Sequence, residues 1–159
     1  MTLAALALAA VITIPPPAEA EDVRPTLALV GGLASPEWVH LGALGRLGPL
    51  GASLALGTVG LGIGLTATGR WYLPAPVAGG FFEAGASVVR LAPVSDQTPG
   101  DLFPLGFVGL GWQWRVGRWL LDAAIGPPPT SLGGPAFLPT VALNALDLPR
   151  MKVDVGYVF

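Results

Sequence analysis

Charged residues are scarce in this sequence. Only 11% of its 159 residues are Asp, Glu, Lys or Arg, whereas a soluble domain carries about a quarter. So few charges cannot cover an ordinary surface in water, which argues against a soluble globular protein. Eight basic residues stand against ten acidic ones and form no basic stripe, so we expect no nucleic-acid partner.

Cysteine is absent, and histidine occurs once. The first absence excludes disulfides and thiolate metal sites, and a single histidine leaves too few ligands for a metal site of the usual kind. A phosphate-binding loop is also missing, because Gly60, Gly62 and Gly64 alternate with apolar residues and open no predicted helix. We therefore expect neither a metal nor another cofactor.

Hydrophobic residues, by contrast, make up 52% of the chain, together with 23 glycines and 17 prolines. The stretch from Leu47 to Gly69 carries no charge and is long enough for a membrane-spanning helix. From Val59 to Thr68, however, large apolar residues alternate with glycine and threonine. A strand sorts such residues onto two faces, whereas a helix scatters them. The pattern favours strands, and a helical inner-membrane protein stays open as an alternative.

The N-terminus has the features of an export signal. Leu3 to Ile14 form an apolar run, three prolines interrupt it, and Ala18-Glu19-Ala20 is a small-x-small cleavage pattern. No Lys or Arg precedes the run, so an uncleaved N-terminal anchor and a misassigned start are the alternatives. We expect residues 1–20 to be a signal peptide and the mature chain to begin at Glu21.

The same alternation recurs along the mature chain. It predicts strands at residues 24–33, 37–47, 50–56, 59–73, 80–91, 103–115, 118–125 and 150–159, separated by turns rich in Gly and Pro. Several of them have the roughly 9 to 11 residues that a tilted membrane strand requires. We expect an all-β fold in which residues 21–159 form an eight-stranded antiparallel up-and-down transmembrane β-barrel.

Residues 137–146 could form a ninth strand. Single-chain bacterial barrels have an even number of strands, which leaves both termini on the periplasmic side. We therefore assign this segment to a long outer loop or to a strand extension beyond the membrane.

Alternation also divides the strands into two faces. One face is apolar throughout and holds Leu27, Leu29, Val39, Leu41, Leu54, Leu56, Leu61, Ile63, Phe82, Ala84, Val108, Leu110, Leu121 and Ile125. The other face is small and polar, and it predicts a lumenal charge network of Arg46, Arg70, Glu83, Arg115, Arg118, Asp122, Lys152 and Asp154. Because side chains fill an eight-stranded barrel, we expect these salt bridges to plug the lumen. A proton or small-ion path is the alternative.

Aromatic residues gather at one end of the predicted barrel. With the strands running alternately up and down, Trp71, Tyr72, Trp112, Trp114 and Trp119 fall toward the end that holds both termini. Trp and Tyr concentrate at membrane–water interfaces. We predict that these five residues form an aromatic girdle on the periplasmic side.

Several segments resemble small bacterial outer-membrane barrels of the OmpA/OmpX-like superfamily. GLGWQWRVGRWLLDAAIG looks like the strand, tight turn and strand near the end of such barrels, and GLTATGRWYLP followed by GFFEAGASVV is similar to their middle hairpin. GYVF resembles the C-terminal signal that the outer-membrane insertion machinery recognises. The resemblance implies a location in the outer membrane of a bacterium with two membranes, contact with outer-membrane lipid, and assembly by that machinery through Tyr157 and Phe159.

The same resemblance implies a non-enzymatic protein with a structural or surface-interaction role in the cell envelope, and it indicates no ligand. A lipid-modifying hydrolase is the alternative. Lipid A deacylase barrels carry a His and a Ser two residues apart on one strand face, but here Gly42 follows His40 at that spacing. A triad assembled across strands from His40 with Ser53 or Ser87 stays open. We assign no catalytic residue.

Overall fold

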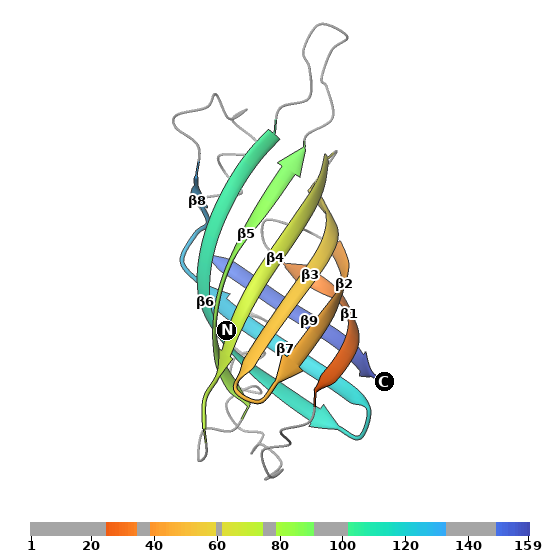
Figure 1. Cartoon of the computed structure of the whole chain (residues 1–159). Coiled ribbons are helices and arrows are strands. Elements are labelled where there is room, and N and C mark those ends of the chain that lie inside the picture. Colours follow the sequence, from red (N-terminus) through yellow and green to blue (C-terminus); the bar gives the residue numbers. More distant parts are fainter. Residues whose placement is uncertain (1–24, 35–38, 60–61, 75–78, 91–101, 133–148) are drawn as a thin grey trace, which may run out of the picture.

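Eight long antiparallel strands form a closed barrel (Figure 1). The computed structural model describes residues 25–34, 39–59, 62–74, 79–90, 102–132 and 149–159. The strands are β1 (Thr26–Ala34), β2 (Val39–Leu47), β3 (Leu50–Val59), β4 (Gly62–Tyr72), β5 (Gly80–Arg90), β6 (Leu102–Val116), β7 (Trp119–Gly126), β8 (Thr130–Ser131) and β9 (Arg150–Val158). The expected signal peptide at residues 1–20 and the segment 137–146 lie outside the described residues.

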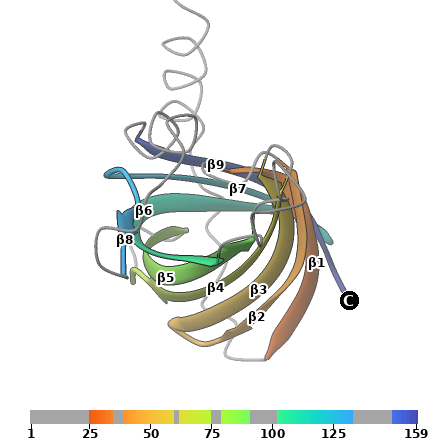
Figure 2. The same ribbon diagram turned by 90° about the horizontal axis from the view of Figure 1, so that it is seen from above.

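The barrel closes between its first and last strands. Each strand from β1 to β6 pairs antiparallel with the next one, β9 pairs with β7, and β9 also pairs with β1 from Ala28↔Val158 to Ala34↔Lys152. Viewed from above, the sheet curls into a ring (Figure 2). The prediction of an all-β, eight-stranded, antiparallel up-and-down barrel is therefore confirmed.

The helical alternative for residues 47–69 is wrong, because β3 and most of β4 occupy this stretch. No helix within the described ranges is long and apolar enough to cross a membrane. One strand lies outside the prediction: β8 pairs through Thr130 and Ser131 with Gly106 and Leu105 of β6. Two residues are too few to show an alternating pattern, which is why the sequence gives no sign of β8.

Two tight turns join neighbouring strands through glycine. Gly48 follows β2 with a φ of 55°, and Gly117 follows β6 with a φ of 61°. Glycine reaches this left-handed region without a steric penalty, and it suits a two-residue hairpin turn. Both turns lie at the end of the barrel where β1 begins and β9 ends (Figure 1). We call this the terminal end.

The two faces of the wall differ in chemistry. Every long strand presents large apolar side chains to the outside, and Leu41 and Leu56 remain 59% and 60% exposed. All described members of the predicted apolar face lie on this outer surface; Leu61 is outside the described residues. Buried polar side chains point the other way, namely His40, Thr66, Thr68, Arg70, Glu83, Ser87, Asp122, Arg150, Lys152 and Asp154. The described residues of the predicted apolar face therefore lie outside, and Arg70, Glu83, Asp122, Lys152 and Asp154 of the predicted polar face lie inside.

Inward glycines make room for large side chains in the lumen. A Cβ atom on Gly111 would lie 2.5 Å from Cε2 of Phe81, and one on Gly85 would lie 2.6 Å from Cζ of Phe107. Each ring therefore fills the space that a side chain on the facing strand would need, as close packing requires. Apolar side chains also fill the lumen at the terminal end, where Ala28, Val30, Leu44, Leu120 and Val158 form one cluster.

Gly32 tests the packing at the closure of the barrel. It pairs with Asp154 of β9 and with His40 of β2, and an added Cβ would lie 2.5 Å from Oδ1 of Asp154 and closer still to the Val153 carbonyl oxygen. Gly32→Ala should therefore lower the free energy of unfolding by about 1 to 3 kcal/mol through overpacking. Urea unfolding of the protein folded in detergent measures this.

Gly45→Ala is the matched control, because the nearest atom to its added Cβ is the Ala52 carbonyl oxygen at 4.0 Å. This variant should stay within about 0.5 kcal/mol of the parent protein. Equal unfolding midpoints for the two variants would contradict the described approach of β1 to β9.

Candidate functional site

A layer of charged side chains crosses the middle of the lumen. Arg70 on β4 donates from Nη1 to Oδ2 of Asp122 on β7, at 2.5 Å, and its Nε lies 3.4 Å from Oε2 of Glu83 on β5. Arg70 and Glu83 are register neighbours, whereas β5 and β6 separate β4 from β7 around the ring. The Arg70–Asp122 bond therefore spans the interior rather than following the wall.

Glu83 also pairs with a second arginine. Arg150, the first residue of β9, directs Nη1 to Oε1 of Glu83, and both side chains are buried. The predicted network does not include Arg150, although the predicted strand at residues 150–159 begins with it. Its alternation with Lys152 and Asp154 on the last strand was the signal that could have identified it.

The same strand supplies the rest of the cluster. The Asp154 carboxylate lies between Nζ of Lys152, 2.8 Å from Oδ2, and Nε2 of His40, 2.7 Å from Oδ1. His40 reaches Asp154 across β1, and the residue between them in the register is Gly32. A side chain at that position would occupy the space through which the two groups meet.

Charges in this layer are equal in number. Three cations face three carboxylates, with His40 beside them: Arg70, Arg150 and Lys152 against Glu83, Asp122 and Asp154. We call these seven residues the lumen network. Each ionic side chain is at least nine-tenths buried, and an ion pair in such surroundings requires a partner for every charge. The network meets that requirement with side chains from β2, β4, β5, β7 and β9.

Aromatic rings flank the cations of the network. The Arg70 Cζ atom lies 4.4 Å from the Phe81 ring centroid, and the Arg150 Cζ atom lies 3.6 Å from that of Phe107. Toward the terminal end, Arg46 stacks on the Tyr72 ring with its Cζ 3.9 Å from the centroid. Such cation–π contacts stabilise a desolvated guanidinium. Rings, salt bridges and apolar side chains of the described residues all lie in the lumen, which side chains are expected to fill in a barrel of eight strands.

Three arginines of the predicted network are not part of the lumen network: Arg46, which stacks on Tyr72, and the two arginines next to the β6–β7 turn, Arg115 and Arg118. Arg115 is the penultimate residue of β6. Its Nε donates to the Gly117 carbonyl oxygen at 3.0 Å. Arg118 is exposed in the turn, where its Nη1 donates to the Tyr157 hydroxyl at 3.3 Å and the phenol raises the pKa of the guanidinium. The prediction placed Arg115 and Arg118 in the lumen because it followed the alternation into the turn, where the alternation ends.

The five residues of the predicted girdle do not share one environment. Trp71 and Trp119 are about 60% exposed on the outer surface. Tyr72 is buried inside, because adjacent residues of a strand point to opposite faces. Trp112 and Trp114 lie on one face of β6 with ring centroids 6.5 Å apart, and Trp114 is buried. The girdle prediction is therefore wrong for Tyr72. It considered the height of this residue along the barrel but not the face of the strand on which the residue lies.

The C-terminal residues pack at the terminal end of the barrel. The Tyr157 ring meets Trp119 edge to face at 5.4 Å, and Phe159 meets Tyr157 in the same manner at 5.7 Å. The Phe159 backbone N–H donates to the Leu27 carbonyl oxygen at 3.0 Å. The last three residues therefore extend the contact between β9 and β1 to the very end of the described chain.

The polar groups of the lumen meet one another. No group of three or more His, Cys, Asp or Glu side chains that could hold a metal ion occurs among the described residues. Ser87, one of the hydroxyls considered with His40, accepts a hydrogen bond from Thr66 at 2.8 Å. His40 itself meets Asp154, a carboxylate already bound by Lys152. The arrangement holds charges in place across the barrel.

In comparisons with known proteins, no family model, curated protein or solved structure matches the chain.

Arg70 is the residue on which the network can be tested most directly. Arg70→Met leaves the Asp122 carboxylate buried without its partner, so the free energy of unfolding should fall by about 3 to 5 kcal/mol. Arg70→Met combined with Asp122→Asn should be less destabilised than Arg70→Met alone, because Arg150–Glu83 and Lys152–Asp154 remain balanced. Urea unfolding in detergent, followed by gel mobility, measures both.

Arg118→Met is the control, since it removes an exposed arginine from the β6–β7 turn and should leave the unfolding midpoint nearly unchanged. If Arg70→Met and Arg118→Met unfold at the same urea concentration, the ion pairs across the lumen do not stabilise the barrel.

Proposed function

We propose that the chain is a bacterial outer-membrane β-barrel with a plugged lumen and a non-enzymatic, structural or surface-interaction role in the cell envelope. The observation that carries the proposal is the inverted polarity of the closed barrel. Its outer surface is apolar on every long strand, and its ion pairs lie inside. Lipid is the surrounding in which both features are favourable.

A barrel designed for water would have the opposite distribution. Exposed apolar surface is unfavourable in water by roughly 25 cal/mol per Å², and monomeric soluble proteins rarely expose large continuous apolar patches. Here exposed Leu, Val and Ile side chains follow one another around the ring. In hydrocarbon the same surface carries no such penalty. Closure then becomes necessary, because lipid cannot satisfy the backbone groups of a free strand edge.

The dimensions of the wall suit a bilayer. β1, β2 and β9 have nine residues each, and at about 3.4 Å per residue such a strand is roughly 30 Å long. A tilt of about 40° reduces this to a height of roughly 23 Å, close to the apolar band of about 25 Å on membrane barrels. Trp71 and Trp119 would then lie near one interface.

The partners follow from the location. Outer-membrane lipid would cover the apolar exterior, and the terminal Tyr157 and Phe159 would present the chain to the outer-membrane insertion machinery. The closed eight-stranded architecture is consistent with the resemblance to OmpA/OmpX-like barrels. The filled lumen supports a role other than bulk conduction, and the proposal assigns His40 to the lumen network rather than to a hydrolytic site.

Electrophoretic mobility and cell fractionation test this proposal together. The unheated protein should migrate differently from the boiled protein, and it should sediment with outer-membrane rather than inner-membrane markers. Purified protein in planar bilayers should show no large steady conductance. A soluble fraction that folds without detergent, or a large conductance, would overturn the location or the plugged lumen respectively.

Leu54 probes the surroundings of the outer face. It lies midway along β3, is 54% exposed and stands between Ala43 and Ala67. Leu54→Arg should lower the free energy of unfolding in lipid vesicles by about 2 to 4 kcal/mol, because a charge near the bilayer midplane is unfavourable. Val116→Arg, next to the β6–β7 turn, should have an effect of about 0 to 1 kcal/mol. Equal tolerance at both positions would mean that water surrounds the barrel.

Deletion of Phe159 distinguishes assembly in the cell from folding of the purified chain. Removing it deletes one backbone hydrogen bond and one ring contact at the edge of the barrel, so refolding of the purified chain in detergent should be nearly normal. The amount of folded protein in the outer membrane should fall several-fold, whereas Phe159→Tyr should keep most of it. Normal membrane levels after deletion would remove the C-terminal residue from the assembly signal.

A further inference from the structure

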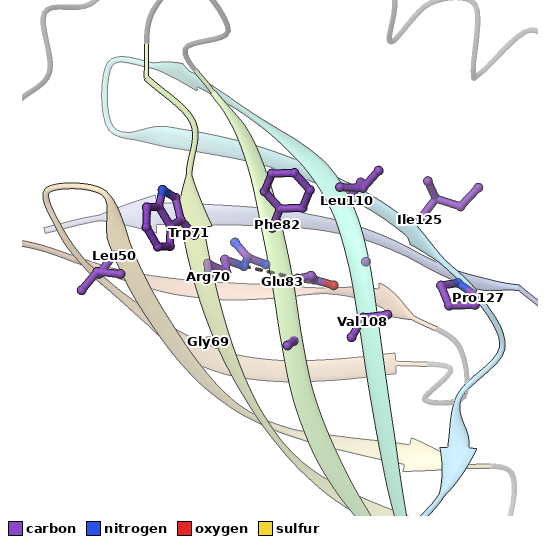
Figure 3. A pocket seen from close by; sticks show the side chains of 12 residues that line it. Leu50, Gly69, Arg70, Trp71, Phe82, Glu83, Val108, Leu110, Ile125 and Pro127 are labelled. Carbon is purple, nitrogen blue, oxygen red and sulfur yellow. Dashed lines mark ion pairs between the residues drawn. The ribbon is translucent and has the colours of Figure 1, made fainter.

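A groove of about 590 Å³ runs over the outer face of β4, β5 and β6 (Figure 3). Its floor includes Gly69 and Ala84, which are register neighbours. Because their side chains are absent or small, the backbone of the sheet is exposed at this point. The next outward-facing register row toward the terminal end forms the wall of the groove. It consists of large side chains, Trp71, Phe82, Leu110 and Ile125. The groove is thus an apolar depression with a defined boundary at one end.

Beyond the groove, β5 continues toward the other end of the barrel. The outward side chains after Ala84 are those of Ala86, Val88 and Arg90, and all are exposed. Ala86 pairs with Ala67 of β4, so small side chains adjoin the groove on this side, and Val88 pairs with Leu65 farther along. This row of outward side chains ends at the positive charge of Arg90.

Arg90 is an exposed cation next to apolar outward side chains. Its register neighbours are Ile63 and Leu102, both exposed and apolar. The acidic side chains of the described residues, Glu83, Asp122 and Asp154, are all buried in the lumen network. None of these three can neutralise Arg90 on the outer surface. An anion that lies against the outside of the barrel would be complementary to it.

The separation of Ala84 from Arg90 sets the depth of the groove relative to the cation. Ala84 and Arg90 are six residues apart on β5, which is roughly 20 Å along a strand. With a tilt of about 40° this is roughly 15 Å along the membrane normal, somewhat more than half of the apolar band of about 25 Å on membrane barrels. The distal part of an acyl chain would therefore lie at the groove when the phosphate of the same lipid lies at the level of Arg90.

We propose that this surface binds one anionic phospholipid, with its phosphate on the Arg90 guanidinium and one acyl chain along Ala86 into the groove between Trp71, Phe82 and Leu110. The inference rests on the proposed membrane location. Guanidinium groups are good phosphate ligands, and the apolar lining of the groove gives water few partners. An empty groove would forgo the dispersion contacts that a flexible chain supplies.

Native mass spectrometry of the full chain, released from detergent, tests the site with two lipids of identical acyl chains. The protein should retain one phosphatidylglycerol in preference to phosphatidylcholine, whose headgroup is zwitterionic. Arg90→Gln should reduce retention of phosphatidylglycerol about fivefold, to the level of phosphatidylcholine, and Arg90→Lys should restore most of it. Ala84→Leu fills the floor of the groove and should reduce retention of both lipids.

Ala43→Leu is the control for added bulk, because Ala43 is a small exposed residue on the outer face of β2 and does not line the groove; its lipid retention should equal that of the parent protein. The heat-dependent mobility shift verifies folding of each variant, and Arg90→Gln changes only an exposed side chain. Equal retention of both lipids by the parent protein, or no loss in Arg90→Gln, would overturn the site and leave only non-specific surrounding lipid.

Vesicle insertion and lipid retention distinguish the membrane location from the lipid site. A chain that does not enter vesicles would overturn the membrane location and the lipid site together. A chain that inserts normally, with Leu54→Arg destabilised as expected, but that retains the two lipids equally would overturn the lipid site alone.

Discussion

The pairing of β9 with β1 is the constraint on which the rest of the structure depends. Seven register pairs, from Ala28↔Val158 to Ala34↔Lys152, convert an open sheet into a ring, so every long strand has two neighbours. Eight strands enclose an interior only wide enough for side chains. Whatever points inward must therefore pack against what points inward from the other side, and polar groups there must find their partners among one another.

The lumen network is the consequence of that confinement. Arg70 and Glu83 lie on adjacent strands, but Asp122 and Arg150 come from the far wall to complete their pairs. Buried ion pairs of this kind contribute little net stability compared with apolar packing, although loss of one partner is severe. Their effect here is geometric: the bonds fix β4 and β5 relative to β7 and β9, while glycines such as Gly32 and Gly111 supply the space that long side chains need.

The wall that holds this network inside also shapes the outer groove. Along β4 and β5, Arg70 and Glu83 point inward, and their neighbours Trp71 and Phe82 point outward to form the boundary of the groove. One register row thus contributes to the network on one side and the next to the groove on the other. Because the side-chain period of a strand is two, a one-residue shift in this pairing would exchange the two faces and abolish both features.

The sequence by itself determined the strands, the tight turns at Gly48 and Gly117 and the division into two faces, because these depend on the period-two alternation and on local backbone preferences. Only the tertiary structure decided which charges meet. Arg70 and Asp122 are 52 positions apart, and Arg150 and Glu83 are 67 apart. Their contact requires that residues on distant strands lie at the same level along the barrel axis. The strand registers determine this level, and no local sequence pattern encodes it. For the same reason only the tertiary structure shows that Arg150 meets Glu83, although its inward direction follows the alternation of Lys152 and Asp154. Tyr72 differs, since its inward position follows from the exposed Trp71 beside it and was available from alternation alone.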